Sequence, residues 1–272
     1  MTKPERLTGL DTSFLHLERS GAHMHVASTS IFKGEAPTHA EFRDHIASRL
    51  HLVPRFRQKL RFVPLDQGRP VWIDDPHLNL DYHVRQTALP APGSDEQLRN
   101  LAARIFSQQL DRSKPLWELW LVEGLRDGRF AIIGKSHHAL VDGVSGVDIT
   151  TVLFDLEEEP ENPPVRPPKW APRPEPTNLD LLRDALQERV TSPREIVRGM
   201  RAALRGPRQV LRGLGATGKM LEVATAAPST PFNVEIGPHR RLAFVRSELD
   251  DLKRVKNEHG GTVNDVVLSV VA

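Results

Sequence analysis

Two adjacent histidines, followed three residues later by Asp-Gly, stand out in the segment KSHHALVDGVSG, residues 135–146. A neutral imidazole, whose ordinary pKa is about 6.5, accepts a proton near neutral pH, so His137 or His138 has the chemistry of a general base. Asp142 can orient a histidine, cap a following helix or bind an arginine. Gly143 keeps the turn open to a closely approaching substrate. Three alternatives follow: a proton-transfer site, a metal site, or two histidines that simply end a strand.

The residues before the histidines weaken the metal alternative. FAIIGKS is typical of a strand, and if the strand continues, His137 and His138 point to opposite faces. Two ligands on opposite faces do not share one ion easily, and no other cluster with metal-ligand spacing is evident in the sequence. A proton-transfer site needs only one histidine aimed into a cavity, and the other can serve the fold. The residues alone do not say which histidine is which.

The elements around the motif form a predicted hairpin. PLWELWLVEGL and GRFAIIGKSHHAL are the two strands, and Asp127-Gly128 between them is a hairpin turn signal. A helix is predicted after the motif, from about Gly143 to Leu156. Trp117 and Trp120 on the first strand are interpreted as core residues.

The rest of the N-terminal half alternates between predicted helices and strands. Asp11 or Thr12 is expected to cap a short helix that runs through Leu17. Thr38 is expected to cap a second helix, which Pro54 ends or kinks. The other predicted elements are a strand at His23–Phe32, strands within RPVWIDDP and LDYHVRQTAL, and a helix within DEQLRNLAARIFSQQL.

The composition changes after residue 159. Eight prolines between Pro160 and Pro176 predict an extended connector. A basic helical segment follows, and six of its arginines recur at intervals of three or four residues: Arg194, Arg198, Arg201, Arg205, Arg208 and Arg212. This stripe has two interpretations, an amphipathic element at an anionic membrane surface or a solvated helical excursion.

The C-terminal residues predict a strand in RRLAFVRS, a helix, and the start of another helix, with Ser247 or Thr262 as caps. The chain stops in the apolar run VVLSVVA without a helix stop signal. We therefore expect the sequence to be the N-terminal part of a longer protein.

The bulk composition excludes several classes of site and partner. The chain has 272 residues, 37 basic and 35 acidic, so its formal charge of +2 gives no indication of nucleic-acid binding. It has no cysteine, which removes disulfides and thiolate chemistry and agrees with a reducing cytoplasm. The N-terminal residues lack the apolar core of a signal peptide, and no run approaches the roughly 18 apolar residues of a membrane span.

The histidine segment matches the pattern HHxxxDG, and it resembles the acyl-CoA-dependent acyltransferases of the chloramphenicol acetyltransferase-like superfamily. The strings LDTSFLHLE, MHVAS, PLWELWLVEGL and GGTVNDVVLSVVA resemble the bacterial wax ester synthase/diacylglycerol acyltransferase family, in that order. The resemblance implies an α/β fold with two lobes, each a mixed sheet with flanking helices, and a tunnel between them.

The resemblance also implies a division of the chain. Residues 1–158 correspond to the first lobe and carry HHxxxDG, 159–178 are a proline-rich linker, 179–225 are the basic helical segment, and 226–272 begin the second lobe. The remainder of that lobe is a partner that this chain lacks, so residues 1–272 alone are expected to have little or no activity.

By the same resemblance, His138 is the general base that takes the proton from a hydroxyl group, whose oxygen then attacks the thioester of a fatty acyl-CoA. His137 and Asp142 support the site, Gly143 permits close packing, Asn264 is expected near the reacting carbonyl, and Asp265 has a structural or substrate-binding role. The alternative for the last two is a helix start next to Thr262.

The implied acceptor is diacylglycerol or a long-chain alcohol, and the product is triacylglycerol or wax ester. No cofactor is expected, because acyl-CoA is a substrate. A cytoplasmic protein peripheral to the inner membrane or to lipid inclusions is expected. Two alternatives remain open: a condensation-type transferase acting on another hydroxyl or amine, and a non-catalytic protein that binds lipid surfaces.

Overall fold

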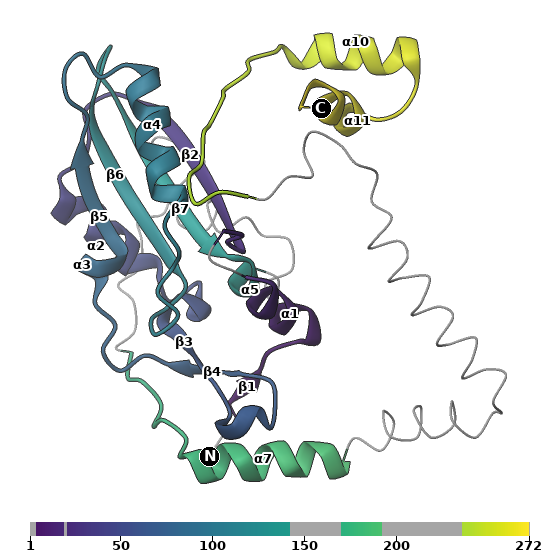
Figure 1. Cartoon of the computed structure of the whole chain (residues 1–272). Coiled ribbons are helices and arrows are strands. Elements are labelled where there is room, and N and C mark those ends of the chain that lie inside the picture. Colours follow the sequence, from purple (N-terminus) through teal and green to yellow (C-terminus); the bar gives the residue numbers. More distant parts are fainter. Residues whose placement is uncertain (1–3, 19–20, 142–169, 192–235, 272) are drawn as a thin grey trace, which may run out of the picture.

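The structure, a computed structural model, describes residues 4–18, 21–141, 170–191 and 236–271 (Figure 1). Its strands are β1 (Glu5–Arg6), β2 (His25–Lys33), β3 (Gln58–Arg61), β4 (Val71–Asp74), β5 (Val84–Ala88), β6 (Trp117–Leu125) and β7 (Arg129–His137). Its α-helices are α1 (Gly9–Leu17), α2 (His39–Arg49), α3 (Leu80–His83), α4 (Asp95–Phe106), α5 (His138–Val141), α7 (Asn178–Thr191), α10 (Leu249–His259) and α11 (Val263–Val271), and two 3-10 helices are η1 (Pro54–Arg57) and η2 (Pro64–Asp66).

A four-stranded mixed sheet, in the order β2-β7-β6-β5, is the centre of the fold. β7 pairs antiparallel with both β2 and β6, whereas β5 pairs parallel with β6. The predicted hairpin of β6 and β7 is confirmed. Its turn places Asp127 at φ 62° and Gly128 at φ 59°, and positive φ at both central positions suits the right-handed twist of the two strands.

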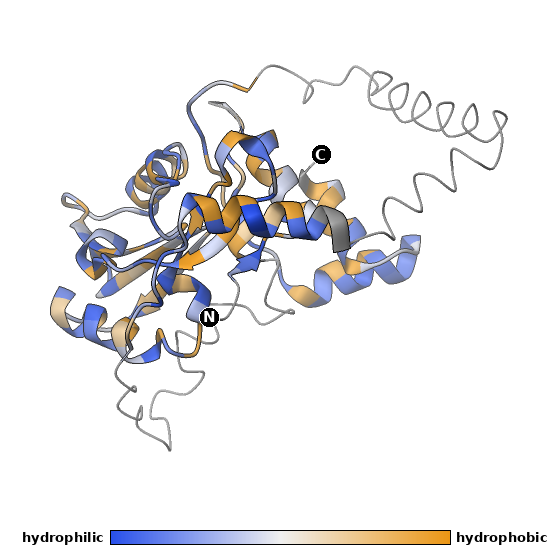
Figure 2. Ribbon diagram, turned by 90° about the horizontal axis from the view of Figure 1, so that it is seen from below, coloured by the Kyte–Doolittle hydropathy of each residue, from blue (hydrophilic) through white to orange (hydrophobic). Residues whose placement is uncertain are grey.

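The two faces of this sheet pack on different layers. Alternate residues of β7 separate, so Ala131 and Ile133 join a cluster with Leu98 and Ile105 of α4. Ile132, between them in sequence, joins a larger cluster that includes Ile46 of α2. Figure 2 shows that the helices around the sheet carry both hydrophobic and hydrophilic residues, as expected for elements with one buried side.

A second, three-stranded antiparallel sheet has the order β1-β4-β3. α7 covers it with Leu181, which is 1 % exposed, and Ala185. Before α7, the Arg173 side chain and backbone N–H donate to the carboxylate of Asp74 in β4 at 3.0–3.1 Å. Only β4 of these strands was predicted: β1 has two residues, and QKLR of β3 has one apolar residue, whereas VWID of β4 has three.

Helix starts confirm some predicted caps and correct others. Thr8, and not Asp11 or Thr12, caps α1, and Asp11 completes the capping box by accepting from Thr8. Thr38 caps α2 as predicted, although the helix ends at Arg49 and Pro54 begins η1.

Three predictions for other elements are wrong. Leu80–His83 is helical and only Val84–Ala88 is a strand, because Asn79 caps the short helix by accepting from the Asp81 N–H. Residues 240–247 are not a strand, since no neighbouring strand among the described residues pairs with them. Ser247 does not cap α10, which starts after Glu248 without a side-chain cap.

The C-terminal segment runs beside α4 before forming a helical pair. The Arg240 N–H donates to Ser107 at the end of α4, and Leu242 packs against the α4 cluster. α10 and α11 then contact each other, and Figure 1 shows this pair set apart from the four-stranded sheet. Their exposed hydrophobic residues include Leu249, Leu268 and Val270.

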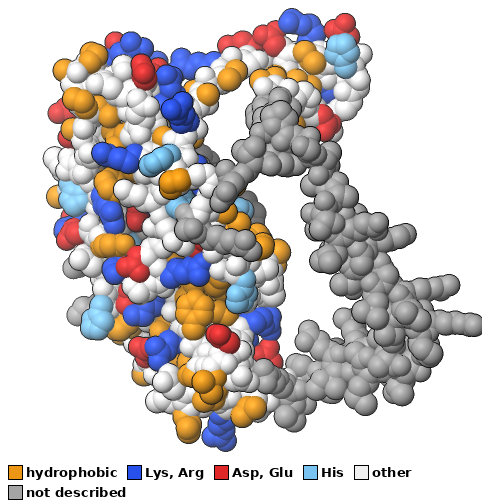
Figure 3. Space-filling view, viewed as in Figure 1, with side chains coloured by type: hydrophobic (Ala, Val, Ile, Leu, Met, Phe, Trp, Pro, Cys, Tyr) orange, Lys and Arg blue, Asp and Glu red, His pale blue; other side chains and the backbone are white. Residues whose placement is uncertain are grey.

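Two predicted features lie outside the described residues: the helix from Gly143 to Leu156 and the arginine stripe from Arg194 to Arg212. Across the described part of the chain, no helix has the length and hydropathy needed to cross a membrane. Figure 3 shows acidic and basic side chains interspersed on the displayed face.

Candidate active site

One end of the four-stranded sheet gathers the histidine motif. β2 begins at His25, directly opposite His137 at the end of β7, and β6 begins at the same end with Trp117. The His137 N–H donates to the Leu116 carbonyl at 3.0 Å, and the His138 N–H donates to the Met24 carbonyl at 2.8 Å. These two backbone bonds hold the histidine pair between the start of β6 and the start of β2.

The two histidines sit on either side of a strand-to-helix junction. β7 ends at His137 and α5 begins at His138, so strand alternation does not continue through the pair. The side chains are separated nonetheless, because the helical turn redirects the chain: His137 is fully buried, whereas His138 is exposed. The prediction that the two are not equivalent therefore agrees with the geometry, for a different physical reason.

His137 is held in one tautomer. The Ala139 N–H donates to its Nδ1 at 3.0 Å, so Nδ1 carries no proton and the neutral ring is protonated on Nε2. Nε2 lies 3.6 Å from Oε2 of Glu18, too long for a hydrogen bond but close enough for electrostatic attraction. The ring thus accepts a hydrogen bond from the first turn of α5 on one side and faces a carboxylate on the other, a position that supports the strand-to-helix junction.

Glu18, just after α1, is the anionic centre behind the junction. Arg112 donates to its Oε2 from Nε at 2.8 Å and again from a terminal nitrogen, which also donates to the Leu15 carbonyl at 2.8 Å. Burial by itself raises the pKa of Glu18, but the contact with His137 and the hydrogen bonds from Arg112 and Gln109 outweigh it and lower the pKa to about 2. The carboxylate is therefore charged at neutral pH.

The His138 ring is exposed and stacks on Phe14 of α1, with ring centroids 4.9 Å apart and an interplanar angle of 27°. α1 and α5 pack against each other, and the Thr8–Asp11 capping box fixes the start of α1. The ring thus combines a supported orientation with access to solvent. A general base requires both, since it must reach a substrate proton in a defined direction.

Further titratable groups surround the buried side of the junction. Lys135 is fully buried, donates to the Ile105 and Gln108 carbonyls at 3.3 and 3.0 Å, and lies 3.4 Å from Glu118. Burial lowers the pKa of His25 to about 4, and the charges of Lys135 and neighbouring His23 act in the same direction. His25 is therefore neutral at physiological pH and adds no charge beside His137.

Asn264 and Asp265 lie on α11, away from the histidines. Asp265 accepts from the Thr262 N–H and hydroxyl, both at 2.7 Å, and its own N–H donates to the Thr262 oxygen at 3.2 Å. This reciprocal bonding is a capping box, so the geometry favours the helix-start interpretation of the pair. Asn264 is exposed, and the contacts of α11 are with α10.

Asp142 and Gly143, the last two residues of the motif, lie outside the described residues. Among those that are described, no group of three or more His, Asp or Glu side chains is placed to hold a metal ion. Trp117 is 1 % exposed, and its indole N–H donates to the Phe56 carbonyl at 2.8 Å, so the geometry agrees with the core interpretation.

Three contributors to the junction were not predicted from the sequence as site residues: Phe14, Glu18 and Arg112. Phe14 and Glu18 belong to the string LDTSFLHLE, and their spacing of four places them on one side of α1 and its C-terminal cap. That spacing is a sequence signal that the two side chains lie near each other. Arg112 is 94 residues from Glu18 and had no local signal.

The sequence profile of the wax ester synthase/diacylglycerol acyltransferase catalytic domain matches residues 7–267. Among curated relatives from Mycobacterium tuberculosis, a "probable diacyglycerol O-acyltransferase", tgs3, is 37% identical over 259 residues, which cover 92% of this chain and 95% of the relative. Another, tgs2, is 37% identical over 271 residues, covering 96% of this chain and 57% of the relative. The chain thus spans nearly all of one relative and little more than half of the other.

A solved structure of the wax ester synthase/diacylglycerol acyltransferase from Marinobacter aquaeolei VT8 has the same fold. It superposes with a TM-score of 0.62 at 29% identity, over 96% of this chain and 57% of that chain. The expected α/β lobe with a mixed sheet and flanking helices is confirmed.

Proposed function

Because the chain belongs to the wax ester synthase/diacylglycerol acyltransferase family, we propose that it transfers a long-chain fatty acyl group from acyl-CoA to the hydroxyl of diacylglycerol, of a long-chain alcohol, or of both. The product is triacylglycerol or wax ester. The observation that carries the proposal is the exposed ring of His138, held against Phe14 at the end of β7 within an HHxxxDG motif.

The proposed step is direct transfer with His138 as the general base. A ring nitrogen of His138 takes the proton as the hydroxyl oxygen bonds to the thioester carbon. The carbon–sulfur bond then breaks, and the departing CoA sulfur receives the proton from the imidazolium, so the histidine returns to its starting form. General-base assistance of this kind contributes about 10²–10⁴-fold to the rate, and holding both substrates together contributes through proximity.

The other residues of the junction have supporting roles in this proposal. His137, with Glu18 and Arg112 behind it, holds the first turn of α5 and so the backbone of His138. Asp142 and Gly143 are proposed to complete the turn after α5, and Asn264 to approach the reacting carbonyl from α11 once substrate is bound. Asp265 serves the start of α11 through its bonds to Thr262.

A His138→Ala variant tests the proposal. Palmitoyl-CoA is offered with diacylglycerol or with hexadecanol, and esters and free CoA are both measured. Ester formation is expected to fall by at least about 10²-fold while the melting temperature is kept, since the ring is exposed. His16→Ala, an exposed histidine on α1, is the matched control. Unchanged turnover in His138→Ala refutes the general-base role, and transfer only to an amine or a carrier-bound acceptor refutes the proposed acceptor.

We also propose that a second lobe completes the site. The support is the exposed apolar surface of α10 and α11 and the greater length of relatives such as tgs2. Activity of residues 1–272 is expected to be low and to rise when the remaining lobe of a two-lobed relative is supplied. Full activity without it contradicts this proposal.

The acceptors are water-insoluble, so we propose that the protein works in the cytoplasm at the surface of the inner membrane or of lipid inclusions. The arginines from Arg194 to Arg212 are the proposed contact with anionic lipid. Reversing the charge of Arg194, Arg198 and Arg201 is expected to weaken binding to anionic vesicles, most strongly at low salt. Absence of vesicle binding by the unaltered protein refutes this part.

A further inference from the structure

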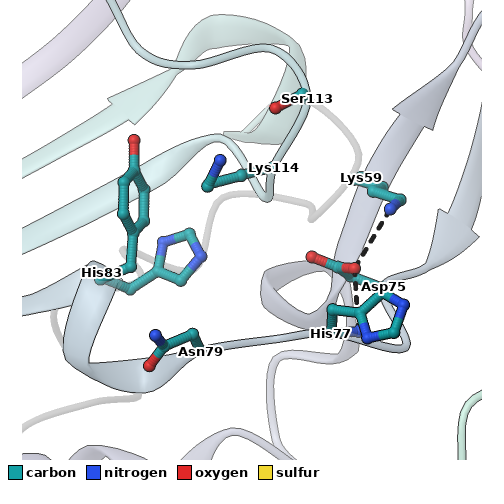
Figure 4. Close-up of a pocket in the computed structure, with 8 residues that line it drawn as sticks. Lys59, Asp75, His77, Asn79, His83, Ser113 and Lys114 are labelled. Atoms are coloured by element: carbon teal, nitrogen blue, oxygen red, sulfur yellow. Dashed lines mark hydrogen bonds and ion pairs between the residues drawn. The ribbon is translucent and has the colours of Figure 1, made fainter.

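A cavity of about 210 Å³, lined by polar and charged residue types, has no role in the mechanism proposed above. Figure 4 shows its walls: His83 and Asn79 face Lys59, Asp75 and His77 across the cavity, with Ser113 and Lys114 from a third segment. Tyr82 completes the lining. Three separate chain segments thus converge on one space, at the start of β5 and β6.

Charge in the cavity is supplied by two ammonium groups. Lys59 is bound to Asp75 at 3.2 Å, and Lys114 donates to Asp111, behind the wall, at 2.7 Å while lying 4.9 Å from the centre of the Tyr82 ring. An ammonium has three donors, so each lysine has further N–H groups for a ligand. In the lining itself the two lysines outnumber the single carboxylate of Asp75, which suits an anion.

His83 gives the cavity a fixed acceptor. His83 is 1 % exposed. Its ring stacks on Trp117 with centroids 4.5 Å apart, and the Tyr82 ring meets it edge-on with centroids 5.1 Å apart. Nδ1 lies 2.8 Å from the Trp117 carbonyl and must donate to it, so a neutral ring has no proton on Nε2. No hydrogen bond from the described residues reaches Nε2, and burial lowers the pKa of His83.

We propose that this cavity binds a phosphomonoester group. Its charged oxygens match the lysine ammonium groups and the amide of Asn79. The bare Nε2 of His83 accepts a hydrogen bond. A phosphomonoester, whose second ionisation lies near pH 6, still has a P–O–H group in part of its population near neutral pH, and this group can donate to Nε2 while the ring stays neutral. A carboxylate, with a much lower pKa, has no such donor.

The position of the cavity relates it to the acyl-transfer site. β7 ends at His137 and β5 starts at Val84, at the same end of the sheet and two strands apart, which is about 10 Å at the usual strand spacing. A phosphomonoester is present on the ribose of CoA and on the headgroup of phosphatidic acid. The naming of CoA as one source rests on the proposed function, whereas binding of a phosphomonoester does not.

Binding is tested first with inorganic phosphate by calorimetry and thermal shift on the intact chain. Lys114→Gln removes an ammonium, and His83→Asn keeps a donor toward the Trp117 carbonyl while removing the acceptor at Nε2. Each is expected to weaken phosphate binding by about tenfold or more, because each removes a hydrogen bond to a charged group. Lys33→Gln, an exposed lysine at the far end of β2, and His138→Ala are expected to leave binding unchanged.

Two matched pairs of ligands distinguish the sources. Tighter binding of CoA than of dephospho-CoA, lost in Lys114→Gln, assigns the site to CoA. Preference for vesicles with phosphatidic acid over phosphatidylglycerol, lost in the same variant, assigns it to a lipid headgroup.

The proposal is overturned if millimolar phosphate does not bind the unaltered chain, or if Lys114→Gln and His83→Asn bind it as the unaltered chain does. Asn79→Ala, at the exposed rim of the cavity, is the substitute if His83→Asn fails to fold, and it is expected to weaken binding in the same direction. Because the readout is binding, failure of the acyltransferase proposal leaves this result interpretable.

Discussion

Replacing Glu18 by Gln should make the free energy of unfolding less dependent on pH between pH 4.5 and about 2, the range in which this carboxyl group titrates. The substitution keeps the shape of the side chain and removes its charge. Arg112, which donates twice to Glu18, then loses its carboxylate partner, and His137 loses the group that lies 3.6 Å from its Nε2. Each of these changes removes attraction that exists only in the folded chain.

The magnitude follows from the pKa of Glu18. The pKa is lowered from the ordinary 4.5 to about 2 by His137, Arg112 and Gln109, against the opposing effect of burial. At about 1.4 kcal/mol per pH unit, the folded state gains roughly 3 kcal/mol from the ionised carboxylate. A lowered pKa means that this stability is fully present above pH 4.5 and is lost as the pH falls from 4.5 to 2.

Urea unfolding followed by tryptophan fluorescence measures the effect. We expect Glu18→Gln to lower the free energy of unfolding by about 3 kcal/mol at pH 7 and by only about 1–2 kcal/mol at pH 3. Glu35→Gln, an exposed glutamate after β2, should differ from the unaltered chain by at most about 0.5 kcal/mol at either pH. A Glu18→Gln difference that stays the same from pH 7 to pH 3 would refute the electrostatic reasoning.

Three further predictions concern titratable side chains packed against the two sheets. The pKa of His25 is lowered to about 4 by burial and by the charges of Lys135 and His23, so the free energy of unfolding should fall as the pH drops from 6.5 toward 4. Urea unfolding of a His25→Asn variant should not show this fall. Lys135→Met should destabilise the fold by about 3 kcal/mol, because it leaves Glu118 without its buried ammonium partner. The double variant with Glu118→Gln should recover part of that loss; a double variant no more stable than Lys135→Met alone would contradict this. Arg173→Gln should detach residues 170–177 from β4, seen as faster proteolysis there with no change in the four-stranded sheet; unaltered cleavage would contradict it.

Local sequence signals predicted the elements that carry the site. The hairpin of β6 and β7 follows from alternation and from Asp127-Gly128, two residue types that tolerate the positive φ of the turn. Thr38 begins α2 as predicted, because a cap acts on backbone N–H groups within three residues. The helix predicted within DEQLRNLAARIFSQQL is α4, and its cap, which was not predicted, is Ser94. The wrong predictions have two causes, a missing partner strand and a local cap that was missed. Residues 240–247 have strand composition without a partner strand among the described residues, and Leu80–His83 follows the Asn79 cap into a helical turn.

The sequence by itself determined the motif, the family resemblance and the hairpin that delivers both histidines to one end of the sheet. It did not determine which histidine is buried, because that depends on where β7 stops and α5 starts. Only the tertiary structure brings Glu18 and Arg112, 94 residues apart, behind His137, and sets Phe14 against His138. The physical reason is range: hydrogen bonds of turns and caps act within a few residues, whereas burial and ion pairing depend on which distant segments pack together.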